Sequence, residues 1–270
     1  MLKTLLLPLA VGCQLAAAGS VQTAEVSDAP VRRPVVLMHG LMATAEAMSH
    51  AQGWIEEDFP GIYVKNVETV PSKIDSLLVD INKQVETFAD AVKNDPELAH
   101  GFNLIGHSQG GLIARAYIHR FNDPPVHNFI SWAGPQAGVF GVPDFNALCP
   151  DALCPWLVEL VDDLLRPEGA SKIAQSLLTF AAYWRSPLNY SSYLENNDFL
   201  ADINNEKSVK NATYKENFES LNALALVYSE KDDIVVPRES PYFTFFDTVD
   251  GTDKKIVPWS EQPMFVSLHA

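Results

Sequence analysis

Short apolar runs alternate with helix-length amphipathic segments along most of the chain. Strand-length runs lie at about 34–38, 61–67, 101–105, 126–132 and 224–228. The run Val35-Val36-Leu37-Met38 is uninterrupted, which is typical of a strand whose two faces are both covered by helices. Between the runs, apolar residues recur at helical spacing, at Ile74, Leu77, Leu78, Ile81, Val85, Phe88 and Val92 and again over 112–119. The alternation predicts an α/β fold with a mostly parallel sheet and helices on both faces.

The segment from about residue 134 to 217 departs from this alternation because it contains no strand-like run. One helical stripe consists of Leu157, Leu160, Val161, Leu164 and Leu165, and another of Ile173, Leu177, Leu178 and Phe180. We expect a helical insert within a single domain over 34–270. Such an insert usually caps a site at the carboxyl ends of the strands. The alternative is a helical elaboration that only completes the core.

The candidate chemistry centres on Gly106-His107-Ser108-Gln109-Gly110, between a strand-length run and a helical segment. In this context Gly-x-Ser-x-Gly is typical of a nucleophile elbow, a tight strand-to-helix turn from which the serine projects. The pattern predicts that Ser108 is a nucleophile. The alternative is a glycine-rich turn without catalysis.

An elbow of this kind places the oxyanion of the reaction at the amino end of the following helix. The backbone N–H of Gln109 is one natural donor, and the loop that follows the first strand can supply the second from Leu41. We interpret His39 and His107, which flank these donors, as turn or packing residues rather than as bases.

A serine nucleophile needs a base, and α/β-hydrolases carry their triad in the order Ser, acid, His. Asp232 follows the run at 224–228 in a loop and is the predicted acid, with Asp233 as its competitor. The alternative for this loop is a solvated charged turn. Only His269 follows Asp232, and it is the penultimate residue.

The first twenty residues have the pattern of a signal peptide. Lys3 precedes an apolar run over 4–15, and small residues at 16–20 suit cleavage after Ala18 or Ser20. The alternative is an uncleaved anchor or a buried first strand. A polar, flexible arm over 21–33 follows. No later segment approaches 18 consecutive apolar residues, so we expect a soluble mature chain.

Removal of that leader removes Cys13 and leaves Cys149 and Cys154. In an oxidising compartment this Cys-x4-Cys pair can form a local disulfide. A metal would need more ligands than two thiols, and no histidine lies near, so we expect no metal or other cofactor. Sequons at Asn189 and Asn211 predict surface positions for both asparagines.

The composition is that of an ordinary globular protein, with 47% hydrophobic and 20% charged residues in 270. Acidic residues outnumber basic ones by 34 to 19, a formal charge of −15. Because nucleic-acid affinity depends on basic residues that neutralise phosphates, a nucleic-acid partner is excluded. An anionic membrane surface is disfavoured for the same reason, and we expect a monomer without stable membrane insertion.

Several longer segments are more specific than the elbow. They are Val36-Leu37-Met38-His39-Gly40, Pro60-Gly61-Ile62-Tyr63-Val64, Gly138-Val139-Phe140-Gly141-Val142-Pro143, Tyr183-Trp184-Arg185-Ser186-Pro187 and Phe199-Leu200-Ala201-Asp202-Ile203-Asn204. With the elbow and the Asp232 loop, they resemble the palmitoyl-protein thioesterases, lysosomal enzymes that remove long acyl chains from cysteine thioesters of S-acylated proteins. The resemblance covers about 34–258.

The resemblance implies an α/β-hydrolase fold and assigns residues to it. Ser108 takes the nucleophile position and Asp232 the acid position. Asn211 falls where the family carries a glycosylated sequon, and Cys149 and Cys154 fall where it has a disulfide. The implied reaction is a two-step acyl transfer on long-chain fatty acyl thioesters. Candidate linings of an acyl groove are Trp132, Phe140, Trp156, Phe180 and Trp184, whose alternative role is cap core.

The end of the chain departs from the family pattern. There the catalytic histidine follows a last core strand, in a Gly-Asp-His type loop, and a final helix comes after it. Residues 264–270 look like the segment before that strand. We therefore expect that the carboxyl-terminal strand and helix are missing, that the base lies beyond Ala270 rather than at His269, and that the 270-residue form is nearly inactive.

The predicted function is hydrolysis of palmitoyl thioesters in the secretory pathway, with the lysosome as the expected location. One alternative is a secreted lipase or carboxylesterase that acts on oxygen esters. The other is an inactive acyl-lipid-binding glycoprotein.

Overall fold

The computed structural model describes residues 32–141, 178–248, 251, 253 and 255–262. The first part contains β1 (Val35–Met38), η1 (Ala45–Met48), α1 (Ser49–Asp58), β2 (Val64–Val67), α2 (Asp75–Leu78), α3 (Ile81–Lys93), η2 (Pro96–Leu98), β3 (Phe102–His107), α4 (Gln109–Arg120) and β4 (Val126–Trp132). The second contains η3 (Thr179–Tyr183), α8 (Tyr190–Asn196), α9 (Leu200–Ile203), α10 (Ala212–Glu219), β5 (Ala223–Val227), η4 (Ser240–Tyr242), β6 (Phe245–Phe246), β7 (Ile256–Val257) and η5 (Trp259–Glu261). The η elements are short 3-10 helices.

The predicted parallel sheet is confirmed. Its five strands have the order β2-β1-β3-β4-β5, and every neighbouring pair is parallel. At the carboxyl ends of the last three strands, His107 pairs with Trp132 and Trp132 pairs with Val227. The loops that follow β3 and β5 therefore leave the same edge of the sheet, two strand spacings or about 10 Å apart.

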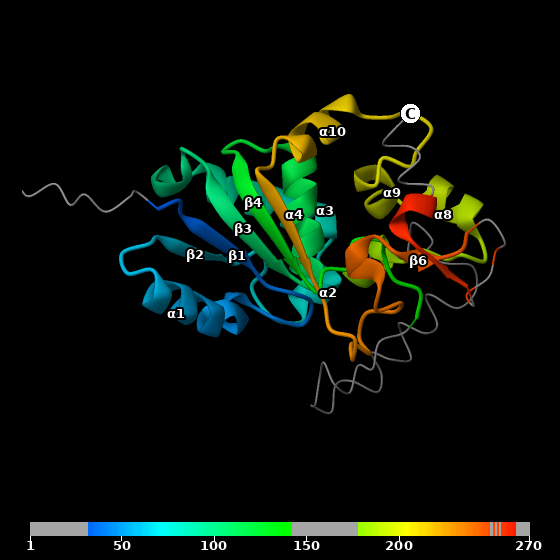
Figure 1. Ribbon diagram of the computed structural model, residues 1–270, viewed down its shortest axis with the longest axis horizontal. Coiled ribbons are helices and arrows are strands. Elements are labelled where there is room, and N and C mark those ends of the chain that lie inside the picture. The colour runs from blue at the N-terminus through cyan, green and yellow to red at the C-terminus, as the bar shows by residue number, and fades with distance from the viewer. Residues whose placement is uncertain (1–31, 142–177, 249–250, 252, 254, 263–270) are drawn as a thin grey trace, which may run out of the picture. The chain divides into compact units, whose positions relative to one another are not determined.

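Alternating residues of β1 divide the core between the two faces of the sheet. Val36 and Met38 pack into the large cluster that includes α3 and α4, whereas Val35 and Leu37 pack with residues of α1 on the other face. All four strand residues are buried. Figure 1 shows α1 on one side of the sheet and α3 and α4 on the other, as the uninterrupted apolar run predicts.

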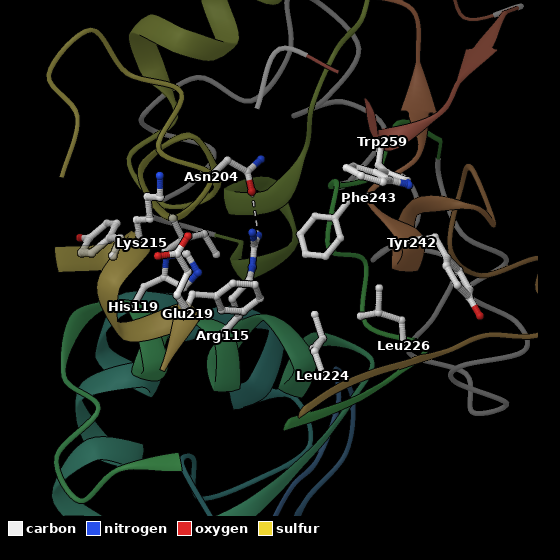
Figure 2. A pocket seen from close by; sticks show the side chains of 13 residues that line it. Arg115, His119, Asn204, Lys215, Glu219, Leu224, Leu226, Tyr242, Phe243 and Trp259 are labelled. Atoms are coloured by element: carbon white, nitrogen blue, oxygen red, sulfur yellow. Dashed lines mark hydrogen bonds between the residues drawn. The ribbon is translucent and has the colours of Figure 1, made fainter. Parts of the chain in front are cut away.

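At the other end of the sheet, β5 has little cover among the described residues. Four of its five residues are exposed, and Leu226 is half-buried. Leu224 and Leu226 face a hollow of about 370 Å³ that residues of α4 and α10 also line (Figure 2). The apolar run at 224–228 is therefore a strand, as predicted, but one that lies at an exposed edge.

The helical stripe from Ile74 to Val92 forms two helices rather than one. The chain becomes extended at Val79, and Asp80 caps α3 by accepting a hydrogen bond from the N–H of Asn82 at 2.7 Å. Spacing alone could not show this break, because the apolar residues of α2 and α3 remain in phase across it. The sequence pattern also gave no signal for α1, which has no buried residue.

The described part of the insert, 178–217, contains helices and no named strand, as expected. A buried ion pair stabilises this part of the insert. Arg185 Nη2 lies 3.1 Å from Glu206 Oε1, and both side chains are almost fully buried. The hydroxyls of Tyr190 and Tyr193 donate to Glu206 at 2.8 and 2.6 Å. These bonds explain why the Tyr183-Trp184-Arg185-Ser186-Pro187 segment carries a fully buried arginine. The stripe from Leu157 to Leu165, and Ile173 and Leu177 of the second stripe, lie outside the described residues, whereas Leu178 and Phe180 are described and buried.

Candidate active site

Ser108 occupies a sharp turn between β3 and α4. Its φ of 53° and ψ of −125° are far from the conformations that a residue with a side chain prefers. Strain of this kind costs about 1–3 kcal/mol and persists only where the surrounding structure imposes it. Here the N–H of Ser108 donates to the carbonyl of Trp132 at 2.8 Å, and the N–H of Gly111 donates to the carbonyl of Ser108 at 2.9 Å. The turn has the geometry of a nucleophile elbow.

The glycines around Ser108 permit a close approach of three backbone segments. A Cβ at Gly106 would lie 2.5 Å from the carbonyl oxygen of Gly110, and one at Gly110 would overlap the carbonyl oxygen of His39. A Cβ at Gly40 would lie 2.9 Å from the Cβ of Ser108. The loop after β1 is thus held directly against the serine.

The predicted oxyanion donors lie in the segments that flank Ser108. Gln109 is the first residue of α4, so its N–H has no partner within the helix. Leu41 follows Gly40 in the adjoining loop and is half-buried. Within the described part of the chain, no hydrogen bond uses either N–H. Both donors therefore remain available to a ligand.

Asp232 is held by local hydrogen bonds in the loop after β5. Its Oδ1 accepts from the N–H groups of Ile234 and Val235, at 2.9 and 3.0 Å. The side chain is half-buried, while that of Asp233 is exposed. A hollow of about 730 Å³ opens beside both carboxylates. Fixed orientation and partial burial favour Asp232 over Asp233 as the acid.

The two histidines next to the donors make structural contacts. His39 is buried, with Nδ1 3.0 Å from the carbonyl oxygen of Gly40 and Nε2 3.0 Å from Glu68 Oε1. His107 packs edge-on against Trp132 at 5.2 Å between ring centroids. Burial lowers the pKa of His107, the charge of Asp232 raises it in part, and His39 lowers it further. Among the described residues, no histidine forms a hydrogen bond with Ser108 or Asp232. His269 lies outside them.

The other predicted positions divide into three groups. Asn189 and Asn211 are exposed, and each caps a helix through its Oδ1, which accepts from Ser192 N at 3.1 Å and from Thr213 N at 3.0 Å. Phe180 and Trp184 are buried and pack together, at 5.9 Å between centroids, so their surroundings favour the role of core residues. Cys149, Cys154 and Trp156 lie outside the described residues.

The hollow beside β5 described above lies farther along α4, at Arg115, seven residues beyond Ser108 (Figure 2). Seven residues of helix correspond to about 10 Å. Arg115 Nη2 donates to Asn204 Oδ1 at 2.8 Å and to the carbonyl of Gln136 at 3.0 Å. The walls are mainly apolar, from Leu224, Leu226 and Phe243. This hollow does not contain Ser108 or the oxyanion donors.

The sequence did not predict a cluster of buried polar side chains that packs behind the elbow. Ser76, Gln84, Gln109, Thr179 and Tyr183 are each at most 3% exposed. The available signal was Gln84, a polar residue on the apolar face of the helix that carries Ile81, Val85 and Phe88. A buried polar side chain needs partners, and Gln84 donates to the carbonyl of Val79 and to Thr179 Oγ1 and accepts from Gln109 Nε2.

The described residues lack two further kinds of feature. None of their helices combines the length and apolar character needed to cross a bilayer. They also contain no cluster of three or more histidine, cysteine, aspartate or glutamate side chains suited to hold a metal ion.

Comparison with known proteins identifies the family. The palmitoyl protein thioesterase family matches residues 34–267. Palmitoyl-protein thioesterase 3 of Dictyostelium discoideum is 47% identical over 233 residues, covering 86% of this chain and 76% of that protein. Palmitoyl-protein thioesterase 1 of Caenorhabditis elegans is 34% identical over 254 residues, covering 91% and 82%. The lysosomal thioesterase PPT2 of Rattus norvegicus is 30% identical over 237 residues, covering 87% and 74%.

Similarity to solved structures is weaker. The mature lipase BlEst2 of Bacillus licheniformis shares 20% identity over 48% of this chain and 51% of its own, with a TM-score of 0.34, and carries no argument about activity. The family match covers nearly all of the chain after the amino-terminal arm, and the parallel sheet with its elbow serine is the α/β-hydrolase arrangement that this family implies. The chain belongs to the palmitoyl protein thioesterase family.

Proposed function

We propose that this protein hydrolyses long-chain acyl thioesters on the cysteines of S-acylated proteins, with Ser108 as nucleophile and Asp232 as the acid of a triad. The observation that carries this proposal is the strained conformation of Ser108 beside the N–H groups of Leu41 and Gln109, which make no hydrogen bond within the described part of the chain. Membership of the family supports thioester hydrolysis, and the names of the relatives supply the palmitoyl protein substrate class.

The reaction proceeds in two acyl transfers. The Oγ of Ser108 attacks the thioester carbonyl while a base takes its proton, and the N–H groups of Leu41 and Gln109 stabilise the oxyanion. The carbon–sulfur bond then breaks and the cysteine leaves as a thiolate, which its pKa of about 8.5 permits, and the thiolate then takes up the proton that the base holds. Water, deprotonated by the same base, attacks the acyl-serine ester and releases the fatty acid and Ser108.

The base is proposed to be a histidine between Ser108 and Asp232. The loops that carry these two residues are separated by about two strand spacings, or 10 Å, which leaves room for an imidazole ring. His39 and His107 are held in other contacts. The variant His269→Ala tests whether this chain carries the base at that position.

A palmitoyl chain would gain up to about 11 kcal/mol of gross stabilisation if its methylenes were buried, at roughly 0.8 kcal/mol each. A long apolar groove near Ser108 is therefore expected. Among the described aromatic candidates, Trp132 is the most exposed, at 39%, and lies beside the end of β3, while Phe140 is partly buried.

We also propose passage through the secretory pathway to the lysosome. The relatives named lysosomal thioesterases and the exposed sequons at Asn189 and Asn211 support this location. A disulfide between Cys149 and Cys154 belongs to the same proposal. Thiol labelling of the secreted protein should find no free thiol before reduction and two after it, and a reactive thiol at either position would contradict the pairing.

The proposed reaction is tested with two matched peptides, one palmitoylated on cysteine and one on serine. Faster hydrolysis of the thioester is the expected result. Preferential hydrolysis of the oxygen ester would instead favour a lipase or carboxylesterase. Saturable binding of fatty acyl groups without turnover of either peptide would favour an acyl-lipid-binding protein.

A further inference from the structure

Ser76 is one member of the buried polar cluster behind the elbow. It belongs to α2, a helix of four residues, and its side chain is fully buried. Neither the sequence motifs nor the proposed reaction gives it a role. Its two oxygen atoms contact two different segments, and these are the segments that carry the predicted oxyanion donors.

The hydroxyl of Ser76 holds the loop after β1. It donates to the carbonyl of Lys73 at 2.6 Å, and its oxygen accepts from the N–H of Met42 at 2.7 Å. Met42 has a φ of 53°, which is unfavourable for a residue with a long side chain and must be imposed by its surroundings. Because Met42 directly follows Leu41, the bond to Ser76 fixes the peptide next to the first donor.

The carbonyl of Ser76 holds the elbow helix. Because α2 ends at Leu78, this carbonyl has no partner within the helix, and it accepts from Gln109 Nε2 at 3.1 Å and from Gln84 Nε2 at 3.3 Å. The backbone N–H of Gln109 is the second predicted donor. Tyr183 donates to Gln109 Oε1 at 3.1 Å, so both ends of this side chain are held.

We propose that Ser76 is the positioning residue that sets the separation and direction of the two oxyanion donors, Leu41 N–H and Gln109 N–H. This inference rests on the proposed function, because it assigns Ser76 a role in the same reaction. Stabilisation of an oxyanion depends on donors within a few tenths of an ångström of the correct place, and a displacement of about 1 Å can cost about a hundredfold in rate.

Three variants separate positioning from general stability. Ser76→Ala removes the acceptor of the Met42 N–H, and Ser76→Thr retains a hydroxyl. Ser72→Ala is the matched control, since Ser72 bonds to Asp75 Oδ2 at 2.7 Å at the exposed start of the same helix. Its hydroxyl has no bond to the loop after β1. Thermal unfolding of each full-length variant shows that it is folded.

The first measurement is hydrogen exchange of the Met42 amide, which needs no substrate. Exchange should be about tenfold faster in Ser76→Ala, the factor expected for loss of one hydrogen bond, and unchanged in Ser72→Ala. Ser76→Thr should restore slow exchange. Equal exchange in wild type and Ser76→Ala would overturn the inference.

The second measurement is the steady-state hydrolysis of a palmitoyl-cysteine peptide. We expect kcat to fall about 10- to 100-fold in Ser76→Ala with KM nearly unchanged, because the lost contact acts on the oxyanion and not on the bound acyl chain. Equal kcat in Ser76→Ala and Ser72→Ala, or an increase of KM alone, would overturn the positioning role. Retention of turnover in Ser108→Ala would overturn the proposed function, and the exchange of the Met42 amide would still report on the contact.

Discussion

The two halves of the candidate site are built in different ways. On the nucleophile side, β1 is wholly buried, and three backbone segments approach Ser108 so closely that Gly40, Gly106 and Gly110 leave no space for a Cβ. On the acid side, β5 is mostly exposed, and Asp232 is oriented by two N–H groups of its own loop.

This difference indicates what determines the geometry on each side. Dense packing resists small displacements, so the position of Ser108 is a property of the core. Asp232 depends on hydrogen bonds within a few residues and little on packing. Added side-chain volume on the nucleophile side should therefore lower the stability of the protein. On the acid side, loss of the charge of Asp232 should lower activity.

The largest effect is expected for Ser108→Ala. In a form of the protein that turns over this substrate, loss of the proposed nucleophile should reduce thioester turnover by several orders of magnitude, as removal of a triad member does in other serine hydrolases. Stability should hardly change, because one hydroxyl is lost from a half-buried position. Turnover of a palmitoyl-cysteine peptide and the melting temperature test both statements, and retention of more than about a tenth of the activity would rule out Ser108 as the nucleophile.

The next effect concerns charge on the acid side. Asp232→Asn keeps an oxygen that can accept from Ile234 and Val235 but removes the negative charge, so turnover should fall by about three to four orders of magnitude. Asp233→Asn is the control and should stay within about twofold of wild type, since Asp233 is exposed. The reverse outcome would make Asp233 the acid.

Added volume on the nucleophile side should cost stability. A methyl group at Gly110 would overlap the backbone of Met38 and His39, so Gly110→Ala should lower the free energy of unfolding by about 3 kcal/mol. Gly53→Ala in α1 is the matched control, because nothing lies within 4 Å of its Cβ position. It should stabilise the protein by about 0.5–1 kcal/mol. Equal effects in a denaturant titration would show that the elbow is not tightly packed.

His119, near the carboxyl end of α4, should make the stability of the protein depend on pH. Burial, followed by repulsion from Arg115 and Arg120, holds the pKa of His119 well below its ordinary 6.5. The unfolded chain therefore binds a proton first as the pH falls, and the stabilising contribution, complete above about 6.5, is lost below it by about 1.4 kcal/mol per pH unit.

His119→Phe tests this dependence, because a phenyl ring retains the ring contacts with Tyr214 and Phe218, which have centroid distances of 5.4 and 5.1 Å. The difference in unfolding free energy between variant and wild type should grow between pH 7 and 5. A constant difference over this range would mean that His119 titrates normally in the folded protein.

The smallest effect is expected on β5. Leu224 is 38% exposed, so Leu224→Ala should cost less than about 1 kcal/mol of unfolding free energy. The same substitution at Leu104 of β3, which is fully buried, should cost about 2–5 kcal/mol. Similar losses at the two positions would show that β5 is covered in solution.

The local sequence determined the elements that carry the chemistry. Apolar runs placed the five strands of the parallel sheet but not β6 and β7, and Gly-x-Ser-x-Gly at a strand-to-helix junction identified the turn at Ser108, because the glycines and the run lengths act within a few residues. The exposed positions of Asn189 and Asn211 were predicted from the sequons and are confirmed. The longer motifs of the insert identified the family, since they are specific to it.

Contacts between distant segments were decided only by the tertiary structure. Ser76 bonds to Met42 and Gln109, which lie 34 and 33 residues away, and Arg185 pairs with Glu206 across 21 residues. The exposure of β5 also depends on which elements lie beside it. An apolar run specifies that a strand forms. Whether other elements bury that strand, and which groups bond to a buried polar atom, depends on the packing of segments that are remote in the sequence.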